Sequence, residues 1–169
     1  IELGAQSMDD EVLLANRRGH TSEDVKRASK LIKENGFELG LQMMTGLYKS
    51  DFKKDMQTAR EIIKLQPDTV RIYPTVVLRG TYLEKMLEKG EYTPQSVEDA
   101  VEISAKLYRF FTQNGIRVLR IGLPDGEDLR NNYIAGAYHP SLGEMVISRD
   151  IRNRIEEEAV NGNVDILVN

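Results

Sequence analysis

The chain has 169 residues, of which 40% are hydrophobic and 30% are charged, values that are typical of a soluble globular protein of one domain or part of one. Its 23 basic and 27 acidic residues give a net charge of -4, which argues against a generally cationic surface for nucleic acid. It contains no cysteine and only two histidines, His20 and His139. This composition excludes disulfides and thiolate ligands within these residues and argues against a zinc site.

No apolar run approaches the roughly 20 residues that span a bilayer, and no signal-peptide pattern opens the chain. The sequence therefore predicts a cytoplasmic protein that does not enter a membrane. Both ends fall inside apolar segments, Ile1 to Gly4 and Val164 to Val168. Because natural termini tend to be polar, we expect the parent protein to continue in both directions.

Short apolar runs alternate with helical patterns over the first 124 residues. Strands are predicted near residues 1–6, 37–44, 69–77 and 116–121, each followed by a helix. Such short, apolar strands favour parallel pairing through right-handed crossovers. The pattern predicts an α/β fold of βα units, arranged either as part of a barrel or as a doubly wound sheet.

Capping residues and chain breakers set the predicted helix bounds. Ser7 and Thr21 each precede an aspartate by three residues, as in a capping box. A helix after Ser50 is expected to bury one face, and Pro94 is expected in the first turn of a long helix. The predicted buried face consists of Phe52, Met56, Ala59 and Ile63.

The character of the sequence changes after Pro124. Residues 125–132 are polar and predict a loop, and residues 141–160 predict an amphipathic helix. We expect residues 1–124 to form one unit and residues 125–169 to form a C-terminal extension of loop, helix and short strand. The predicted inner face of the helix consists of Leu142, Met145, Ile151, Ile155 and Ala159.

Three segments resemble the radical S-adenosylmethionine enzymes, most closely the Elongator catalytic-subunit branch and also the oxygen-independent coproporphyrinogen III oxidase branch. The first combines Ile1-Glu2-Leu3-Gly4-Ala5-Gln6-Ser7 with Asn16-Arg17-Arg18-Gly19-His20. The second is Gly40-Leu41-Gln42-Met43-Met44-Thr45-Gly46-Leu47. The third and most specific is Arg71-Ile72-Tyr73-Pro74-Thr75-Val76-Val77-Leu78-Arg79-Gly80-Thr81.

The resemblance implies that this chain is the C-terminal half of a TIM-like partial (βα)6 barrel. It also implies S-adenosylmethionine and a [4Fe–4S] cluster held by a CxxxCxxC motif. Because the chain has no cysteine, we expect that motif upstream of Ile1. The chain alone is then expected to bind no cluster and to be inactive, while the parent protein is an iron–sulfur enzyme.

Residue roles follow from the same resemblance. Arg18 is similar to the arginine that pairs with the methionyl carboxylate, and Gln6, at a strand end, is suited to the ribose or amino-acid moiety. Gln42 occupies the position where some relatives carry a ribose-binding carboxylate. Tyr73 and Pro74 occupy the positions of residues that contact the adenine. Glu2 is a candidate for lining the barrel interior near the substrate. Each also has a simpler interpretation, such as a polar loop residue, a cation at a helix end or a packing residue.

Three functions remain open at this point. The first is RNA modification, as in Elongator-like relatives that act on tRNA, although no acetyl-coenzyme-A loop follows Pro124. The others are an oxidoreductase of the coproporphyrinogen-oxidase type with a small substrate, and a non-catalytic α/β interaction module. The exposed barrel edge at Ile1 to Gln6 predicts that the chain either self-associates or covers this edge with its own C-terminal segment, Val164 to Val168. A basic stripe for RNA would use Arg71, Arg79, Arg117 and Arg120.

Overall fold

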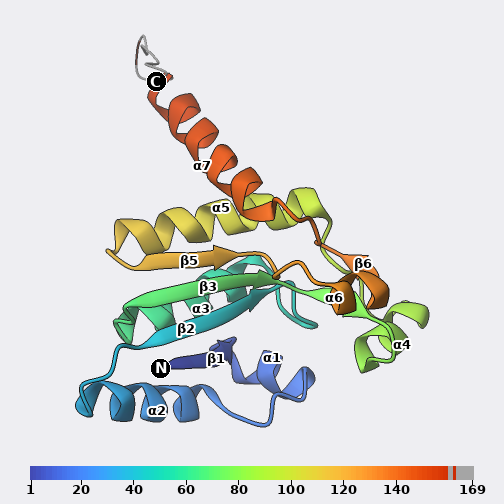
Figure 1. Cartoon of the computed structure of the whole chain (residues 1–169), viewed down its shortest axis with the longest axis horizontal. Helices are drawn as coiled ribbons and strands as arrows, with labels where there is room; N and C mark the ends of the chain where they lie inside the picture. Colours follow the sequence, from blue (N-terminus) through green and yellow to red (C-terminus); the bar gives the residue numbers. More distant parts are fainter. Residues whose placement is uncertain (160–161, 163–169) are drawn as a thin grey trace.

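The computed structural model describes residues 1–159 and 162. Figure 1 shows the order of the elements along the chain. They are β1 (Glu2–Gln6), α1 (Asp10–Ala15), α2 (Ser22–Glu34), β2 (Gly40–Thr45), α3 (Phe52–Lys64), β3 (Thr69–Pro74), β4 (Val76–Leu78), α4 (Tyr82–Glu88), α5 (Val97–Gln113), β5 (Arg117–Ile121), α6 (Glu127–Asn132), β6 (Tyr133–Gly136) and α7 (Leu142–Ala159).

The main sheet has four parallel strands in the order β1-β2-β3-β5. Each of the four strands overlaps a predicted one, and helices connect them, so the predicted parallel α/β architecture is confirmed. Because the strands are parallel, their carboxyl ends meet at one edge of the sheet. Figure 1 shows that α1, α4 and α6 gather beyond that edge.

Helices α2, α3 and α5 cover one face of the sheet. Alternate strand residues point into this layer, where Leu41 and Ile72 meet Phe111 of α5, all three fully buried. Burial of a side chain of this size contributes roughly 1.5–3 kcal/mol relative to exposure. The other alternate residues, including Gln42 and Arg71, lie on the opposite face, which we call the open face.

A second, smaller sheet lies beyond the main one. Strand β4 pairs antiparallel with β6, and their side chains pack with those of α4 around Val77 and Met86. The single strand predicted over residues 69–77 is therefore wrong. The main-sheet strand β3 ends at Pro74, and β4 begins at Val76 and pairs with β6 instead. Pro74, which has no amide hydrogen, stands at the end of β3, as its chemistry requires.

The region after Pro124 is more ordered than its polarity suggested. Residues predicted as loop contain α6, and β6 follows it directly. The small sheet joins residues from both sides of residue 124. The division of the chain at that position stays a prediction.

Helix capping was predicted in part. Thr21 and Asp24 form the expected capping box at the start of α2. At α1, however, the cap is Asp9, whose carboxylate accepts from the Val12 amide at 3.0 Å, and not Ser7. Pro94 lies outside α5, which begins after Ser96.

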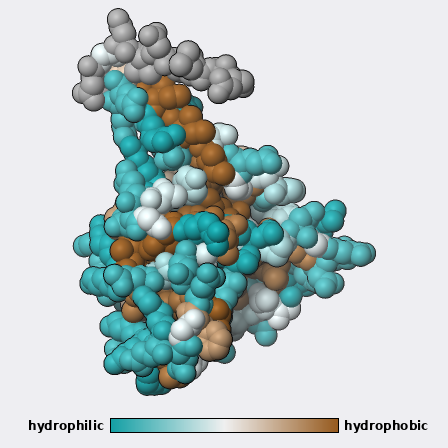
Figure 2. All heavy atoms as spheres, turned by 60° about the vertical axis from the view of Figure 1, so that its left-hand side comes forward, coloured by the Kyte–Doolittle hydropathy of each residue, from teal (hydrophilic) through white to brown (hydrophobic). Residues whose placement is uncertain are grey.

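Helix α7 packs on α5 and on the end of β5 (Figure 1). Its buried positions are Leu142, Val146 and Asp150. The predicted inner residue Ile151 is 43% exposed, as is Ile147, so that part of the prediction is wrong. Figure 2 shows the resulting apolar band along α7. No helix of the described residues is both long and apolar enough to cross a membrane. The predicted strand at Val164 to Val168 lies outside the described residues.

The buried face of α3 is also rotated from the predicted one. Asp55, Thr58, Ala59 and Ile62 are its buried residues, whereas Phe52 is 48% exposed. Lys106 of α5 lies over the Phe52 ring, 5.0 Å from its centroid. The phenyl ring therefore serves as a surface contact and not as part of the core.

Candidate ligand-binding site at the carboxyl ends of the strands

A pocket of about 290 Å³ opens beyond the carboxyl ends of β2 and β3. One wall comes from the end of α1 and the residues after it, and the facing wall from β4 and α4. The floor includes Met44, Leu47 and Thr75. Most of the surface is apolar, and Asn16, Arg17, Arg18, Thr75, Thr81 and Tyr82 contribute polar side chains. An apolar pocket with a few polar groups is typical of small-molecule and cofactor sites.

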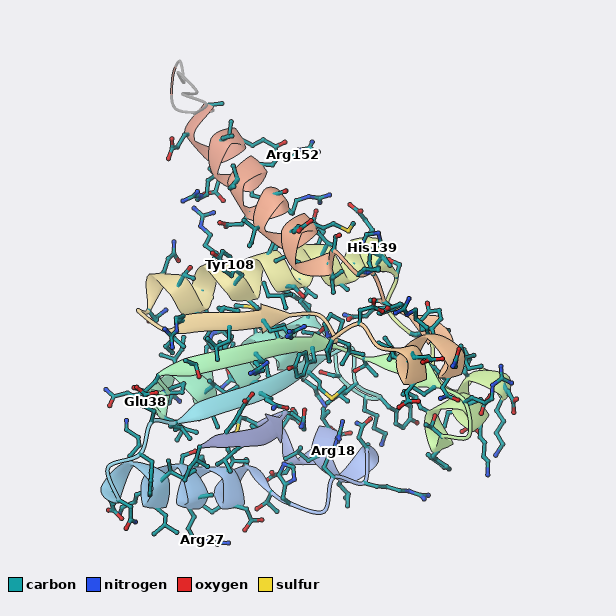
Figure 3. The ribbon with its side chains drawn as sticks, viewed as in Figure 1. Arg18, Arg27, Glu38, Tyr108, His139 and Arg152 are labelled. Atoms are coloured by element: carbon teal, nitrogen blue, oxygen red, sulfur yellow. The ribbon has the colours of Figure 1, made fainter. Side chains whose placement is uncertain are left out.

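Arg18 lines this pocket and carries a partly buried guanidinium group. It follows α1 and lies near the end of β1 (Figure 3). Its Nη2 is 2.8 Å from the Met44 sulfur, while its Nε is buried without a partner among the described residues. Burial lowers the pKa of the guanidinium from its ordinary value. A half-buried guanidinium with no carboxylate partner in the described part of the chain is suited to binding an anion.

Arg17 also lines this pocket. Its guanidinium carbon lies 4.1 Å from the centre of the Tyr82 ring, a cation–π contact between the end of α1 and the start of α4. The two walls of the pocket therefore touch each other.

Gln6 ends β1 in an unusual conformation. Its φ angle is 63°, in the left-handed region that residues with a side chain seldom adopt. Its Oε1 is buried and has no partner among the described residues. Backbone strain together with an unsatisfied polar atom is a combination found at ligand sites.

Glu2, Gln42 and Arg71 form a polar ladder across three strands on the open face. The Gln42 amide nitrogen donates to Glu2 Oε1 at 2.8 Å, and Arg71 Nε lies 2.6 Å from the same oxygen. Arg71 Nη1 also reaches the Tyr73 hydroxyl at 3.4 Å. The structure thus brings Glu2, Gln42 and Tyr73 together. The donor group of Gln42 is already engaged, which leaves its carbonyl oxygen as an acceptor.

The remaining predicted site residue, Pro74, is buried and belongs to the alternate set of β3 residues, opposite to Tyr73. The predicted basic stripe does not form one row. Arg71 and Arg120 are register partners on β3 and β5, but Arg79 lies in the turn after β4 and its amide donates to the Asn132 carbonyl. Arg71 and Arg79 do not share one strand face, because β3 ends at Pro74 and Arg79 follows β4.

The sequence pattern does not reveal the buried carboxyl group of Asp55, which lies in the first turn of α3 and is 2% exposed. It accepts from the Ser50 hydroxyl at 2.5 Å and from the Gly46 amide at 3.2 Å, and so holds the loop after β2. Burial raises the pKa of Asp55 to about 6 despite these hydrogen bonds. The Tyr92 hydroxyl donates to the Gly46 carbonyl of the same loop at 2.7 Å. Burial, aided by the charge of Asp55, raises the pKa of Tyr92 to about 12.

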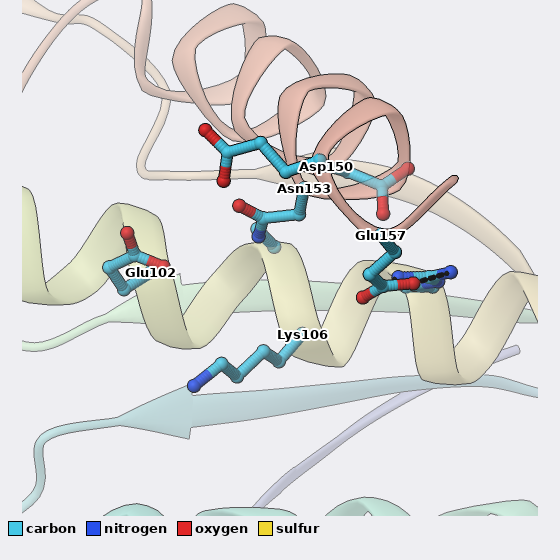
Figure 4. Close-up of a pocket in the computed structure, with 8 residues that line it drawn as sticks. Glu102, Lys106, Asp150, Asn153 and Glu157 are labelled. Carbon is cyan, nitrogen blue, oxygen red and sulfur yellow. Dashed lines mark hydrogen bonds and ion pairs between the residues drawn. The ribbon is translucent and has the colours of Figure 1, made fainter. Parts of the chain in front are cut away.

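A larger hollow of about 460 Å³ lies between α5 and α7 (Figure 4). Its charged groups already have partners: Arg109 donates to both carboxylate oxygens of Glu157 at 2.7 Å, and Arg154 lies 3.6 Å from Asp150. Lys106 is directed to the Phe52 ring. We therefore assign the candidate site to the carboxyl-terminal edge of the main sheet. There Arg18 lines the smaller pocket, and its buried Nε has no partner among the described residues.

Comparison with protein families gives one match. The model of the radical SAM C-terminal domain matches residues 67–154. Among solved structures, the archaeal Methanocaldococcus infernus Elp3 with an N-terminal deletion superposes with a TM-score of 0.81 at 30% identity, over 90% of this chain and 36% of that chain. Streptococcus suis SuiB superposes with a TM-score of 0.52 at 13% identity, over 76% of this chain and 27% of that one, which shows the fold alone.

Curated relatives agree with this match. The tRNA uridine(34) acetyltransferase of Methanocaldococcus jannaschii is 40% identical over 61% of this chain and 20% of its own length. Elongator complex protein 3 of Homo sapiens is 33% identical over 88% of this chain and 27% of its own length. The chain thus spans only about a fifth to a quarter of the curated relatives that it matches.

Proposed function

Because this chain belongs to the radical SAM C-terminal domain family, we propose that it supplies part of the S-adenosylmethionine site of a tRNA-modifying enzyme. In this proposal residues 1–124 form the C-terminal half of the barrel and residues 125–169 form an extension. The observation that carries the proposal is the pair of buried, unpartnered polar atoms, Gln6 Oε1 and Arg18 Nε, near the carboxyl ends of the parallel strands. Parallel barrels bind their ligands at this end.

The residues present fit S-adenosylmethionine. The guanidinium of Arg18 is suited to its carboxylate, and the free carbonyl oxygens of Gln6 and Gln42 are suited to hydroxyl or ammonium groups. Tyr73 and Pro74 are proposed to lie near the adenine, and Glu2 to orient Gln42 through their hydrogen bond. When bound, S-adenosylmethionine supplies radical chemistry, while these residues hold it and exclude water.

The [4Fe–4S] cluster does not fit the residues of this chain. The sequence has no cysteine, and the described residues contain no group of three or more metal-ligating side chains. We propose that the parent protein supplies the cluster ligands from outside this chain. The chain alone is then expected to be inactive.

The proposed substrate class is tRNA, because two relatives that are 40% and 37% identical to this chain over 106 residues are named as tRNA uridine(34) acetyltransferases. A tRNA substrate is consistent with a cytoplasmic location. The names of these relatives also include acetyl transfer, but this chain spans only about a fifth of their length. For this chain we therefore propose only a contribution to the radical S-adenosylmethionine reaction and not to acetyl transfer. Oxidoreduction of a small substrate is the alternative outcome of the test.

Equilibrium binding to the full-length protein, purified and reconstituted without oxygen, tests this function. Arg18→Ala should weaken S-adenosylmethionine binding about tenfold or more, the loss expected for an ionic hydrogen bond. Gln6→Ala should weaken it as well. Wild-type protein that does not bind S-adenosylmethionine would refute the cofactor, and turnover of a small substrate but not of tRNA would refute the substrate class.

The edges of the sheet also matter for assembly. In the described residues, β1 pairs only with β2, which leaves its outer edge without a ladder partner. Such an edge favours pairing with another strand. We propose that this chain, expressed alone, self-associates through β1. Light scattering tests the proposal, and a monomer over a wide concentration range would contradict it.

A further inference from the structure

The end of β1 is a tight turn centred on Gln6. The Ser7 amide donates to the Ala5 carbonyl at 2.7 Å, which closes a three-residue γ-turn around the positive φ of Gln6. A γ-turn with a positive central φ is rare and strained. The surrounding structure must therefore hold it in place.

His20 contacts this turn from the loop after α1. Its Nε2 lies 3.2 Å from the Ala5 carbonyl oxygen, the same oxygen that closes the turn. Its Nδ1 lies 3.2 Å from the carbonyl oxygen of Arg18, two residues earlier in the chain. One imidazole ring therefore connects the backbone beside Gln6 with the backbone of Arg18.

Both contacts require the imidazole ring to be the hydrogen-bond donor. A carbonyl oxygen only accepts hydrogen bonds, so each ring nitrogen must donate a proton to form its bond. A neutral imidazole donates from one nitrogen and satisfies one carbonyl, whereas an imidazolium donates from both. A side chain without ring N–H groups would release both carbonyls.

We propose that His20 is a positioning residue, which fixes the relative placement of Gln6 and Arg18 without itself touching the ligand. This inference rests on the proposed function, because it concerns the S-adenosylmethionine site. Three observations carry it: the strained turn at Gln6, the two carbonyl contacts of His20, and the buried, unpartnered atoms on both residues that the ring connects.

The first test is a double-mutant cycle on S-adenosylmethionine binding in the full-length protein. His20→Phe keeps a planar ring of similar size and removes both donors. It should weaken binding about three- to tenfold, the effect of losing ordinary hydrogen bonds. If His20 acts through Arg18, His20→Phe together with Arg18→Ala should lose less affinity than the product of the two separate losses.

The matched control is His139→Phe, which changes the only other histidine of the chain. His139 lies before the start of α7, far from Arg18 (Figure 3), and its Nδ1 accepts from the Ser141 amide. This variant should bind S-adenosylmethionine with wild-type affinity. Wild-type affinity in His20→Phe, or losses that multiply in the double variant, would overturn the positioning role.

A second measurement does not require the cofactor. Hydrogen exchange of the Ser7 amide reports the γ-turn directly, and His20→Phe should make it faster by at least severalfold while the exchange of core amides in β2 stays the same. If wild-type protein binds no S-adenosylmethionine, the proposed function fails, yet this measurement still tests the role of His20 in the turn. Unchanged Ser7 exchange would refute that role.

Discussion

The side-chain amide nitrogen of Gln6 lies over Gly4, in the space that a β-carbon at position 4 would occupy. Gly4 thus allows the Gln6 side chain to fold back along the strand. Because the conflicting atom is the far end of a flexible side chain, Gly4→Ala should displace Gln6 and leave the fold in place. We expect the free energy of unfolding to change by less than about 1 kcal/mol, while S-adenosylmethionine binding to the full-length protein weakens about tenfold.

Gly126→Ala is the control for this substitution. Gly126 is also a glycine with ordinary backbone geometry, and a β-carbon there meets no atom within 4 Å. It should leave binding unchanged. If Gly4→Ala binds S-adenosylmethionine as tightly as wild-type protein, the orientation of Gln6 seen here is not the one used for binding.

The orientation of α7 gives a second prediction. Leu142 is 1% exposed and Ile151 is 43% exposed, although the sequence pattern placed both on the inner face. Leu142→Ala should lower the free energy of unfolding by about 2–5 kcal/mol, because it leaves a cavity against α5. Ile151→Ala should change it by less than about 1 kcal/mol. Equal losses in urea denaturation would show that α7 packs as the sequence pattern suggested.

The main sheet was predictable because its strands are short, apolar and separated by strong breakers. A helix ends at or just before each of three breaker pairs, which are Asn35-Gly36, Gln66-Pro67 and Asn114-Gly115. The small sheet was not predictable, because β4 and β6 have three and four residues and pair across more than fifty positions. The prediction for α7 failed for another reason. Its apolar residues occupy two faces, with Leu142 and Val146 on one and Ile147 and Ile151 on the other, and only tertiary packing selects the first.

The sequence predicted which residues belong to the candidate site, but not the hydrogen bonds and ion pairs that connect them. Alternation along β2 placed Gln42 on the face opposite to Leu41 and Met43, and burial agrees. The bonds of Glu2 to Gln42 and Arg71 depend on strand register, which no local pattern gives. Asp55 was missed because a carboxylate in the first turn of a helix is ordinarily a solvent-exposed residue that favours the helix dipole.

The capping box of α2 supplies a third prediction. Thr21 accepts from the Asp24 amide at 3.2 Å, and Asp24 accepts in return from the Thr21 amide at 2.9 Å. These bonds lower the pKa of Asp24, with the backbone bond from Thr21 as the largest cause. Thr21→Ala should reduce the free energy of unfolding by about 1 kcal/mol. The neighbouring Ser22→Ala is the control, and an equal loss there would show that the cap is not the cause.

The buried carboxyl group of Asp55 predicts how stability depends on pH. Its pKa rises from the ordinary value of 3.8 to about 6, chiefly through burial, so the folded protein binds its proton more tightly than the unfolded chain does. The resulting stability is fully present below about pH 4 and is lost as the pH rises through about 6, by about 2–3 kcal/mol. Asp55→Asn, which cannot ionise, should lack this loss. Urea denaturation between pH 4 and pH 7.5 measures the difference between the two proteins at each pH, with the exposed Glu88→Gln as a control that keeps the wild-type profile. A constant difference between wild-type protein and Asp55→Asn across that range would show that Asp55 is already ionised in the folded protein at pH 4.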